Sequence, residues 1–498
     1  MGDLGRGHSP DLQVIEMSDM EGNSDRRSFL KGSVAFATAA AHWHMWAASE
    51  CLPAYYAEHL AAVESKVKAR LGDCPSSFFF LTDPHVKWNR KMSGRIVAEL
   101  IRRTGIRIVL CGGDLVEAFG ADYPTDKGAV DYAISVYREH WVRPIRSAGG
   151  RLYTAKGNHD FTVRHAPGAD AKSATGYTMD GLAARKLIRD EFTEGGIVSN
   201  ADDPSACYYY FDEAAAKTRF IVADTTDSES SGMTAWGVRS GMHDPQLRWL
   251  AERALCTTPA GYGIVAMHHI PCMGVVGKDE DAKRFTPWRT MLEAYQVRKP
   301  WSSGGLTYDF SNARGSIILD LTGHHHSERQ TFSEGILHLT EPCDAAYDDY
   351  IYGSKPWCGD LPRKKKGSIY EQTLGVVQVD AVRRLVHVTR IGGGQDRVIH
   401  LDPVAVRVGA AHRFAATRFA GSVSFACYDC DRAASKPVPG RPYDRLFEYR
   451  NDVASIAPDG TLTALRPGFS LVVARNAALE KEIFPVTVYD IKTKSGKA

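Results

Sequence analysis

The sequence lacks an excess of charge of either sign, since 61 lysines and arginines stand against 59 aspartates and glutamates and the formal net charge is +2. A chain with such balanced charge has no global field that would attract nucleic acid or an anionic membrane surface. It also lacks any apolar run of the length that a membrane-spanning helix needs. Function must therefore come from local groups of residues.

Cysteine is sparse, with 10 residues in a chain of 498, which is too few for a disulfide scaffold. Cys427 and Cys430 form a single CxxC pair, and zinc would need a second ligand pair at suitable spacing. A local disulfide, or no bond, is the favoured interpretation. Histidine is more plentiful, with 18 residues, many in tight clusters, and imidazole is a usual ligand of borderline metals.

The length of 498 residues exceeds what one hydrophobic core usually supports, so two or three domains are expected. Apolar and amphipathic stretches alternate over residues 73–398, which is typical of a layered α/β domain. Short alternating apolar segments with many turn residues predict an all-β domain over residues 401–490. Within it, Asp459-Gly460 and Pro467-Gly468 are predicted hairpin turns.

The apolar patterns predict the individual elements of the first domain. A helical stripe runs from Met92 to Ile101, another helix is expected over residues 130–145, and Asp244 is the expected N-cap of a third. Strands are predicted at residues 77–81, 106–111, 151–155, 220–223, 263–267, 316–321, 336–339, 374–379 and 384–390.

Residues 24–31 read SDRRSFLK and precede a mildly apolar stretch, residues 32–41, that is too short to span a bilayer. The string resembles a twin-arginine export signal. The resemblance implies a signal and N-terminal arm over residues 1–50, cleavage after Ala41 or Ala48, and a periplasmic or extracellular location reached through the twin-arginine machinery. An exposed basic arm is the alternative.

Five short polar motifs each follow a predicted strand, at the end where open α/β sheets place their ligand sites. Carboxylate, amide and imidazole groups in these positions suit a pair of metal ions, with Asp114 able to bridge them. Any one motif has an ordinary structural explanation as a cap or a turn, but all five together do not. The motifs are Asp83-Pro84-His85, Gly112-Gly113-Asp114, Gly157-Asn158-His159-Asp160, His268-His269-Ile270-Pro271 and Gly323-His324-His325-His326.

In order and spacing these motifs resemble the calcineurin-like metallophosphoesterase superfamily, whose pattern is DxH, GD, GNH, an H before xP, and GHxH. The match runs from about Phe78 to His326. It implies a four-layer αββα sandwich and two metal ions. The first metal would be bound by Asp83, His85, Asp114 and His326, and the second by Asp114, Asn158, His269 and His324. His268 is the alternative to His269.

The resemblance further implies that a metal-bound hydroxide attacks phosphorus, with His159 as general acid and Glu117 orienting its ring. The mixed nitrogen and oxygen ligands suit Fe, Mn or Zn. Phosphodiesters or a broad range of phosphoesters are the favoured substrates, because no strongly basic cluster lies near the motifs. Residues 363–366, RKKK, are interpreted as a solvated loop.

Two other functions remain open from the sequence. One is a phosphomonoesterase of the nucleotidase or acid phosphatase type. The other is a surface-binding protein with a vestigial metal domain, because residues 453–474 resemble the end of a bacterial immunoglobulin-like group 2 module. That resemblance implies contact with the cell envelope through the all-β domain.

Overall fold

The computed structural model describes residues 52–86, 89, 91–116, 127–160, 181–227, 233–234, 237–238, 241–273, 285–326, 328–344, 364–419, 421–429, 433–438, 441–449 and 451–490. Residues 53–498 belong to one compact unit. The predicted export segment and Glu117 lie outside the described residues, as does Cys430 of the CxxC pair. The unit mixes helices with large sheets, which confirms the expected α/β class.

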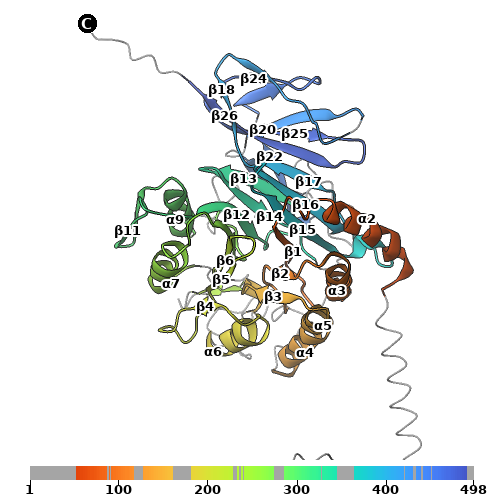
Figure 1. Cartoon of the computed structure of the whole chain (residues 1–498), viewed down its shortest axis with the longest axis vertical. Helices are drawn as coiled ribbons and strands as arrows, with labels where there is room; N and C mark the ends of the chain where they lie inside the picture. The colour runs from red at the N-terminus through yellow and green to blue at the C-terminus, as the bar shows by residue number, and fades with distance from the viewer. Residues whose placement is uncertain are drawn as a thin grey trace, which may run out of the picture. The chain divides into compact units, whose positions relative to one another are not determined.

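A ten-stranded mixed sheet runs through the unit in the order β20-β25-β26-β17-β16-β15-β1-β2-β3, with β18 beside β26 (Figure 1). Strands β1, β2 and β3 are parallel to one another, and β15 joins β1 in the antiparallel sense. The strands are β1 (Ser76–Leu81), β2 (Ile108–Cys111), β3 (Arg151–Thr154), β15 (Thr373–Asp380), β16 (Leu385–Gly392), β17 (Arg397–His400), β18 (Val404–Arg407), β20 (Ser424–Asp429), β25 (Gly468–Arg475) and β26 (Lys481–Tyr489).

A second sheet has seven strands in the order β13-β14-β12-β9-β6-β5-β4. Its central strands β6, β9, β12 and β14 are parallel. Being buried on both faces, they carry near-continuous apolar runs, as central parallel strands do. The strands are β4 (Val198–Ser199), β5 (Tyr209–Glu213), β6 (Thr218–Val222), β9 (Gly263–Met267), β12 (Ser316–Thr322), β13 (Arg329–Ser333) and β14 (Ile336–Thr340).

The inner faces of the two sheets pack against each other around one large hydrophobic core. Phe78 of β1 meets Phe220 of β6 edge to face, with ring centroids 5.4 Å apart. Tyr153 of β3 stacks on Phe211 of β5 at 3.6 Å. Such aromatic pairs add to the stabilisation from buried apolar area. The packing fixes one sheet against the other and thereby brings their strand ends together.

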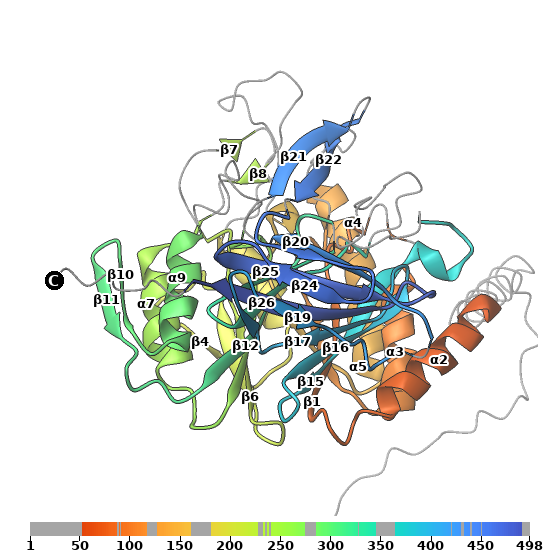
Figure 2. The same cartoon turned by 90° about the horizontal axis from the view of Figure 1, so that it is seen from above.

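Helices cover the outer face of each sheet (Figures 1 and 2). Beside the first sheet lie α2 (Ala57–Lys68), α3 (Ser93–Thr104), α4 (Lys127–Tyr137) and α5 (Arg143–Ser147). Beside the second lie α7 (Asp244–Trp249) and α9 (Thr286–Gln296), whose apolar side chains form a second core with the outer face of that sheet. The layers therefore follow the order helices, sheet, sheet, helices.

Shorter elements connect these layers. The helical turns are η1 (Ala54–Tyr56), η2 (Arg138–Val142), η3 (Asn158–Asp160), α6 (Gly181–Arg185), η5 (Lys186–Glu191), η6 (Leu250–Leu255) and η7 (Ile369–Glu371). The small sheets pair β7 (Met233–Thr234) with β8 (Gly237–Val238), β10 (Pro300–Ser303) with β11 (Leu306–Asp309), β21 (Ala433–Val438) with β22 (Arg441–Tyr449), and β19 (Ala411–Arg413) and β23 (Ala454–Ile456) with β24 (Thr461–Ala464). Among the described helices, none is long and apolar enough to cross a bilayer.

All nine strands predicted for the first domain are present within a few residues of their expected bounds. The helix expected over residues 130–145 is realised as α4, η2 and α5 in succession. The N-cap assignment of Asp244 was wrong. His243, with extended backbone, is the N-cap, and Asp244 is the first residue of α7. There the negative carboxylate of Asp244 interacts favourably with the positive end of the helix dipole.

One of the two predicted hairpin turns in the C-terminal part is confirmed. Gly460 has a φ of +85° between the antiparallel strands β23 and β24, and the Asp459 carboxylate accepts hydrogen bonds from the backbone and hydroxyl of Thr461. The Pro467-Gly468 hairpin was wrong, because the strands on either side, β24 and β25, belong to different sheets. Gly468 instead begins β25.

The C-terminal strands are continuous with the first sheet, because β17 pairs in parallel with β26. A buried ionic network reinforces this junction. Arg397 of β17 and Lys481 of β26 both approach Glu328, which precedes β13 of the second sheet, at 3.6 Å and 3.0 Å. Residues 401–490 therefore share a sheet and charged contacts with the rest of the unit, while their kinship to an immunoglobulin-like module stays a prediction.

Candidate metal centre

The five polar motifs lie at the C-terminal ends of five parallel strands. Motifs one to three follow β1, β2 and β3 of the first sheet, and motifs four and five follow β9 and β12 of the second. Backbone hydrogen bonds continue between neighbouring loops beyond the strands, from Asp83 N to Gly113 O and from Gly323 N to His269 O. Because the sheets pack face to face, both sets of loops meet at one place.

The first group of side chains consists of Asp83, His85, Asp114 and His326. One donor atom from each lies within 4.8 Å of all the others. The Nε2 atom of His326 is 3.0 Å from Asp83 Oδ1, and the Nε2 atom of His85 is 3.8 Å from Asp114 Oδ2. These are the four residues that the sequence predicts for the first metal.

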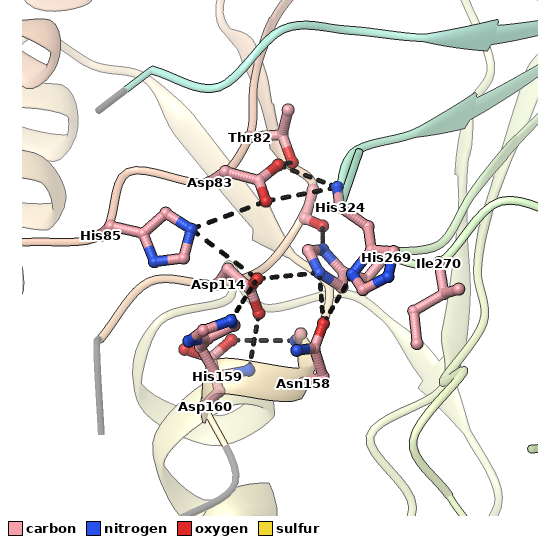
Figure 3. A network of polar contacts seen from close by, with 12 residues as sticks. Thr82, Asp83, His85, Asp114, Asn158, His159, Asp160, His269, Ile270 and His324 are labelled. Carbon is pink, nitrogen blue, oxygen red and sulfur yellow. Dashed lines mark hydrogen bonds and ion pairs between the residues drawn. The ribbon is translucent and has the colours of Figure 1, made fainter. Parts of the chain in front are cut away.

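The second group surrounds the other side of Asp114 (Figure 3). The Nε2 atom of His269 lies 3.0 Å from Asp114 Oδ2 and 3.0 Å from Asn158 Oδ1. The Nδ1 atom of His324 lies 2.8 Å from the same amide oxygen. Asp114, His269 and His324 each offer a donor atom within 4.8 Å of the others. The structure thus gathers all four residues predicted for the second metal, with Asp114 common to both groups.

The adjacent histidines of motif four point in different directions. His269 anchors its Nδ1 atom on Gly112 O at 2.8 Å and directs Nε2 toward Asp114. His268 anchors Nδ1 on Ile270 O and directs Nε2 toward Asp320, outside the two groups. The geometry therefore favours His269 over His268 as the fourth-motif member of the centre.

Backbone strain is concentrated in these loops. Five of the predicted ligands have positive φ, a conformation that side chains other than glycine rarely adopt and that collects at functional sites. They are Asp83 at 53°, His85 at 36°, Asp114 at 54°, His324 at 67° and His326 at 52°. The loops also need glycine for close approach, since a β-carbon on Gly323 would lie 2.0 Å from Thr82 Oγ1 and 2.4 Å from Asp83 Oδ2.

His159 is a partly exposed neighbour of Asp114. Its side chain is 24% exposed, and its Nε2 atom is 3.9 Å from Asp114 Oδ2. Its backbone nitrogen donates to Asp114 Oδ1 at 2.7 Å, which fixes the residue beside the Asp114 carboxylate. The ring also packs edge-on against His85, with centroids 4.9 Å apart. Its expected partner Glu117 lies outside the described residues.

The charges of the centre perturb one another. Burial opposes protonation of His269, but the Asp114 carboxylate outweighs it and raises the pKa of His269 to about 9. Burial alone would raise the pKa of Asp114, yet His269 and His159 hold it below its usual range. The negative charge of the buried carboxylates favours protonation of the imidazoles between them. The same charge would attract a divalent cation.

The donor chemistry fits two cations. In the first group, the Nε2 atoms of His85 and His326 lie 3.2 Å apart and both approach Asp83 Oδ1, at 3.7 Å and 3.0 Å. A cation in this space would be bound by all three lone pairs. In the second group, the hydrogen bond from Nδ1 of His269 to a carbonyl leaves Nε2 as the metal-binding nitrogen, the usual outer arrangement of a ligating histidine. Carboxylate, amide and imidazole donors suit Fe, Mn or Zn.

Several supporting residues were missed in the sequence. Asp160, the last residue of motif three, accepts hydrogen bonds from the backbone nitrogens of Leu115, Val116 and Gly157 and ties motif two to motif three. Burial and the charge of Asp114 raise the pKa of Asp160 to about 6. Its position as the fourth residue of the motif was the available signal. Thr82, whose hydroxyl donates to Asp83 Oδ2 at 2.6 Å, gave no signal.

Two buried groups beside the centre were also missed. Lys156 pairs with Asp224 at 2.6 Å, both almost fully buried, and so fixes the loop that carries Asn158 to the end of β6. Cys343 donates its thiol hydrogen to Asp83 O at 3.3 Å, and its sulfur belongs to a close group with His85 and His326. Both residues are distant in sequence from the partners they meet, so no local pattern identifies them.

Lys364 corrects the prediction of a solvated loop at residues 363–366. Its side chain is buried, and its ammonium donates to Cys343 O at 3.0 Å and to Thr373 Oγ1 at 2.7 Å. Burial lowers its pKa to about 8. Lys365 and Lys366 are exposed, as expected, while Arg363 lies outside the described residues. The prediction was wrong for Lys364, because Cys343 O and Thr373 Oγ1 satisfy its ammonium in the interior.

No protein-family model matches the chain, and no curated protein with a similar sequence was found. Partial similarity to solved structures includes PhoD, with 11% identity over 64% of this chain and 71% of that chain and a TM-score of 0.38. GAP50, described as the anchor in the inner membrane complex of Plasmodium, shares 12% identity over 63% of this chain and 83% of that chain, with a TM-score of 0.32.

Phosphopantetheinyl hydrolase from Mycobacterium tuberculosis shares 12% identity over 54% of this chain and 89% of that chain, with a TM-score of 0.25. Because the identities and TM-scores of all three are low, these similarities assign neither an activity nor ligands to this chain.

Proposed function

We propose that this protein is an exported dinuclear-metal phosphoesterase that hydrolyses phosphodiesters or a broad range of phosphoesters. The observation that carries the proposal is the pair of side-chain groups that share Asp114 and meet at the ends of five parallel strands. The order of the five motifs along the chain, which resembles the calcineurin-like metallophosphoesterases, supports it independently. Export rests on the resemblance of residues 24–31 to a twin-arginine signal.

In this mechanism Asp83, His85 and His326 would hold one cation together with Asp114. Asn158, His269 and His324 would hold the second, also together with Asp114. When bound, the two cations would activate water at neutral pH and neutralise charge on the phosphoryl oxygens. The strained backbone of five of these residues keeps their donor atoms preorganised before substrate arrives.

His159 is the group that would protonate the leaving oxygen. Its ring is partly exposed, lies beside Asp114, and is held through its backbone nitrogen. Protonated at Nε2, it would donate to the alkoxide as the ester bond breaks. Glu117 remains the predicted orienting residue for this ring.

The position of Lys364 favours a substrate with a single phosphate charge. Within the RKKK run, the ammonium of Lys364 donates to Cys343 O and Thr373 Oγ1. It is buried and therefore poorly placed to capture a phosphate dianion. A diester carries one negative charge less than a monoester dianion and needs less cationic capture.

The test compares a diester with a monoester on the purified full-length chain. Bis-p-nitrophenyl phosphate and p-nitrophenyl phosphate are supplied with added manganese, and the rates are measured beside metal content. The wild type should hydrolyse the diester at least as fast as the monoester. In Asp114→Asn the rate should fall by about 1,000-fold, because several kcal/mol of metal-derived transition-state stabilisation is lost.

His412→Ala, at an exposed position in β19, is the control and should retain the wild-type rate. Hydrolysis of the monoester alone would replace the diesterase proposal by the phosphomonoesterase alternative. Absence of hydrolysis of both esters by a metal-loaded wild type would overturn the proposed function.

A further inference from the structure

A second cluster of metal-ligating side chains lies outside the centre described above. It consists of His268, Cys272, Asp320 of β12 and His338 of β14. All four are buried, with exposed fractions of 0%, 2%, 1% and 5%. His268 belongs to motif four but faces away from the proposed centre, and the other three residues lie outside the five motifs. Because the proposed mechanism uses none of the four, their convergence needs its own explanation.

The donor atoms of this cluster converge on the Asp320 carboxylate. His268 Nε2 lies 2.9 Å from Asp320 Oδ1, and His338 Nδ1 lies 2.8 Å from Asp320 Oδ2. Cys272 Sγ is 3.4 Å from Asp320 Oδ2 and 3.9 Å from His338 Nδ1. The donor atoms of His268, Cys272 and Asp320 all lie within 4.8 Å of one another. Around one tetrahedral ion the two His–Asp separations would widen by about 0.5 Å from these values.

In each histidine of the cluster, the ring nitrogen that faces away from Asp320 contacts an oxygen atom that orients the ring. His268 Nδ1 contacts Ile270 O at 2.8 Å, and His338 Nε2 contacts Ser333 Oγ at 2.8 Å. In each ring the second nitrogen is thereby directed at Asp320. A hydrogen bond at the outer nitrogen that fixes the tautomer and the ring plane is characteristic of metal-binding histidines. His269 shows the same arrangement toward the proposed dinuclear centre, through Gly112 O.

The contact between His268 and Asp320 has a feature that a simple hydrogen bond does not explain. Although His268 Nε2 and Asp320 Oδ1 are 2.9 Å apart, neither atom makes a hydrogen bond of acceptable geometry within the described part of the chain. The two atoms still attract each other as an ion pair, but buried polar atoms without a well-aligned hydrogen bond are unfavourable. A cation bound by both lone pairs would satisfy both atoms.

We propose that His268, Cys272, Asp320 and His338 form a third, structural metal site that binds zinc. Two imidazoles, one thiolate and one carboxylate make a four-coordinate donor set, and thiolate favours zinc over the harder cations. Four protein ligands would leave no open coordination position, which separates a structural site from a catalytic one. On binding, the Cys272 thiol loses its proton to solvent and the thiolate binds the ion.

Such a site would hold the strand ends beside the proposed centre in place and would take no part in the reaction itself. It would join the end of β9 to β12 and β14, and His268 is the residue before His269. The inference does not depend on the proposed function, because the site would be present whether or not the chain hydrolyses phosphoesters.

The test uses metal analysis and cobalt spectroscopy on the full-length chain. Wild type, Cys272→Ser and Cys343→Ser are purified without added metal, and bound zinc is measured by mass spectrometry. Cys343→Ser is the matched control, since Cys343 is the buried thiol beside the first group of the centre. After exchange into Co²⁺, a thiolate ligand produces a charge-transfer absorption band that histidine and carboxylate ligands do not.

The wild type and Cys343→Ser should show the thiolate band, and Cys272→Ser should lose both the band and one zinc ion per chain. If Cys272→Ser does not fold, His338→Gln should weaken zinc binding by about 10- to 100-fold or more, because it removes a ligand rather than an outer partner. A band that disappears in Cys343→Ser and persists in Cys272→Ser would overturn the proposal.

A wild type without any thiolate band, and with no zinc beyond the dinuclear centre, would also overturn it, leaving a metal-free hydrogen-bonded cluster. Ester hydrolysis is scored separately. A chain that has the band but no esterase activity would contradict the proposed function and not this site.

Discussion

Gly157 lies directly against Asp114, the residue common to both groups of the centre. A β-carbon on Gly157 would be 2.2 Å from the backbone nitrogen of Asp114 and 2.2 Å from its Oδ1 atom. Atoms do not approach so closely, and backbone cannot move aside as a flexible side chain can. Motifs two and three can therefore meet only if this position has no side chain.

Gly157→Ala should displace Asp114 and reduce phosphodiester hydrolysis by about 100-fold, the effect expected of a misplacement near 1 Å in a preorganised site. Metal content should fall as well. Gly72→Ala is the control, since a β-carbon there would have no heavy atom within 4 Å. Wild-type rates and metal content in Gly157→Ala would show that the loop relaxes and that the contact is unimportant.

His159→Ala should separate substrates by their leaving groups. General acid catalysis contributes about 100- to 10,000-fold when the leaving oxygen is basic, and little when it is p-nitrophenolate. We expect a large loss on an alkyl phosphodiester, a small loss on bis-p-nitrophenyl phosphate, and unchanged metal content, because His159 belongs to neither group of donors. Equal losses on both esters would instead assign His159 a positioning role.

Arg397→Met should destabilise the junction between the two sheets. Arg397 is buried, contacts Glu341, and lies 3.2 Å from Gln330 Oε1. Its removal takes one buried partner from Glu341 and Glu328, while Arg390 still contacts both carboxylates and Lys481 still contacts Glu328. The expected cost is therefore about 2–3 kcal/mol, that of losing buried hydrogen bonds to charged groups. Urea denaturation of the full-length chain measures this change.

Lys66→Met is the control for that experiment. Lys66 bridges Asp396 at 2.7 Å and Glu480 at 2.9 Å, but its side chain is 46% exposed. Exposed pairs contribute at most about 1 kcal/mol. Similar losses in the two variants would mean that burial does not set the strength of the Arg397 network.

Stability should fall as the pH is lowered from 6.5 to 4, partly through His387. Burial, with the nearby charges of Arg70 and Arg418, lowers the pKa of His387 from 6.5 to about 4. The unfolded chain then binds a proton below pH 6.5 that the folded chain does not bind until about pH 4. The free energy of unfolding therefore falls by up to about 2 kcal/mol as the pH drops from 6.5 to 4. Above pH 6.5 this loss is absent.

His387→Gln should have a shallower decline in unfolding free energy between pH 6.5 and pH 4, measured by denaturant titration at several pH values. His412→Gln, at an exposed position, should decline like the wild type. An unchanged slope in His387→Gln would exclude His387 as the titrating group.

Much of the fold could be predicted because strand patterning is local. The apolar run that ends at Leu81 and the shorter run that ends at Cys111 are readable without tertiary information, and β1 and β2 end at those residues. The loops that follow carry the site residues, and parallel strands direct their carboxyl ends to a common edge. The strand predictions and the grouping of the motifs therefore succeeded together.

The failures share a different cause. Pro467-Gly468 has the composition of a hairpin turn. The strand that follows it, β25, pairs with β20 and β26 and so belongs to a different sheet from β24. Lys364 belongs to a basic run, but Cys343 O and Thr373 Oγ1 offer acceptors in the interior. In both places contacts with distant segments outweighed local preference.

The sequence alone determined which residue types stand at which strand ends, because strand periodicity and motif order are properties of neighbouring residues. Only the tertiary structure decided which of two adjacent histidines faces Asp114. His269 turns toward the proposed centre because Gly112 O accepts from its ring, and His268 turns toward Asp320 because Ile270 O accepts from the other. Ile270 O is a local acceptor, but the contact of His269 with Gly112 O and the cluster of His268 with Asp320 and His338 form only in the folded chain, which brings distant strands together.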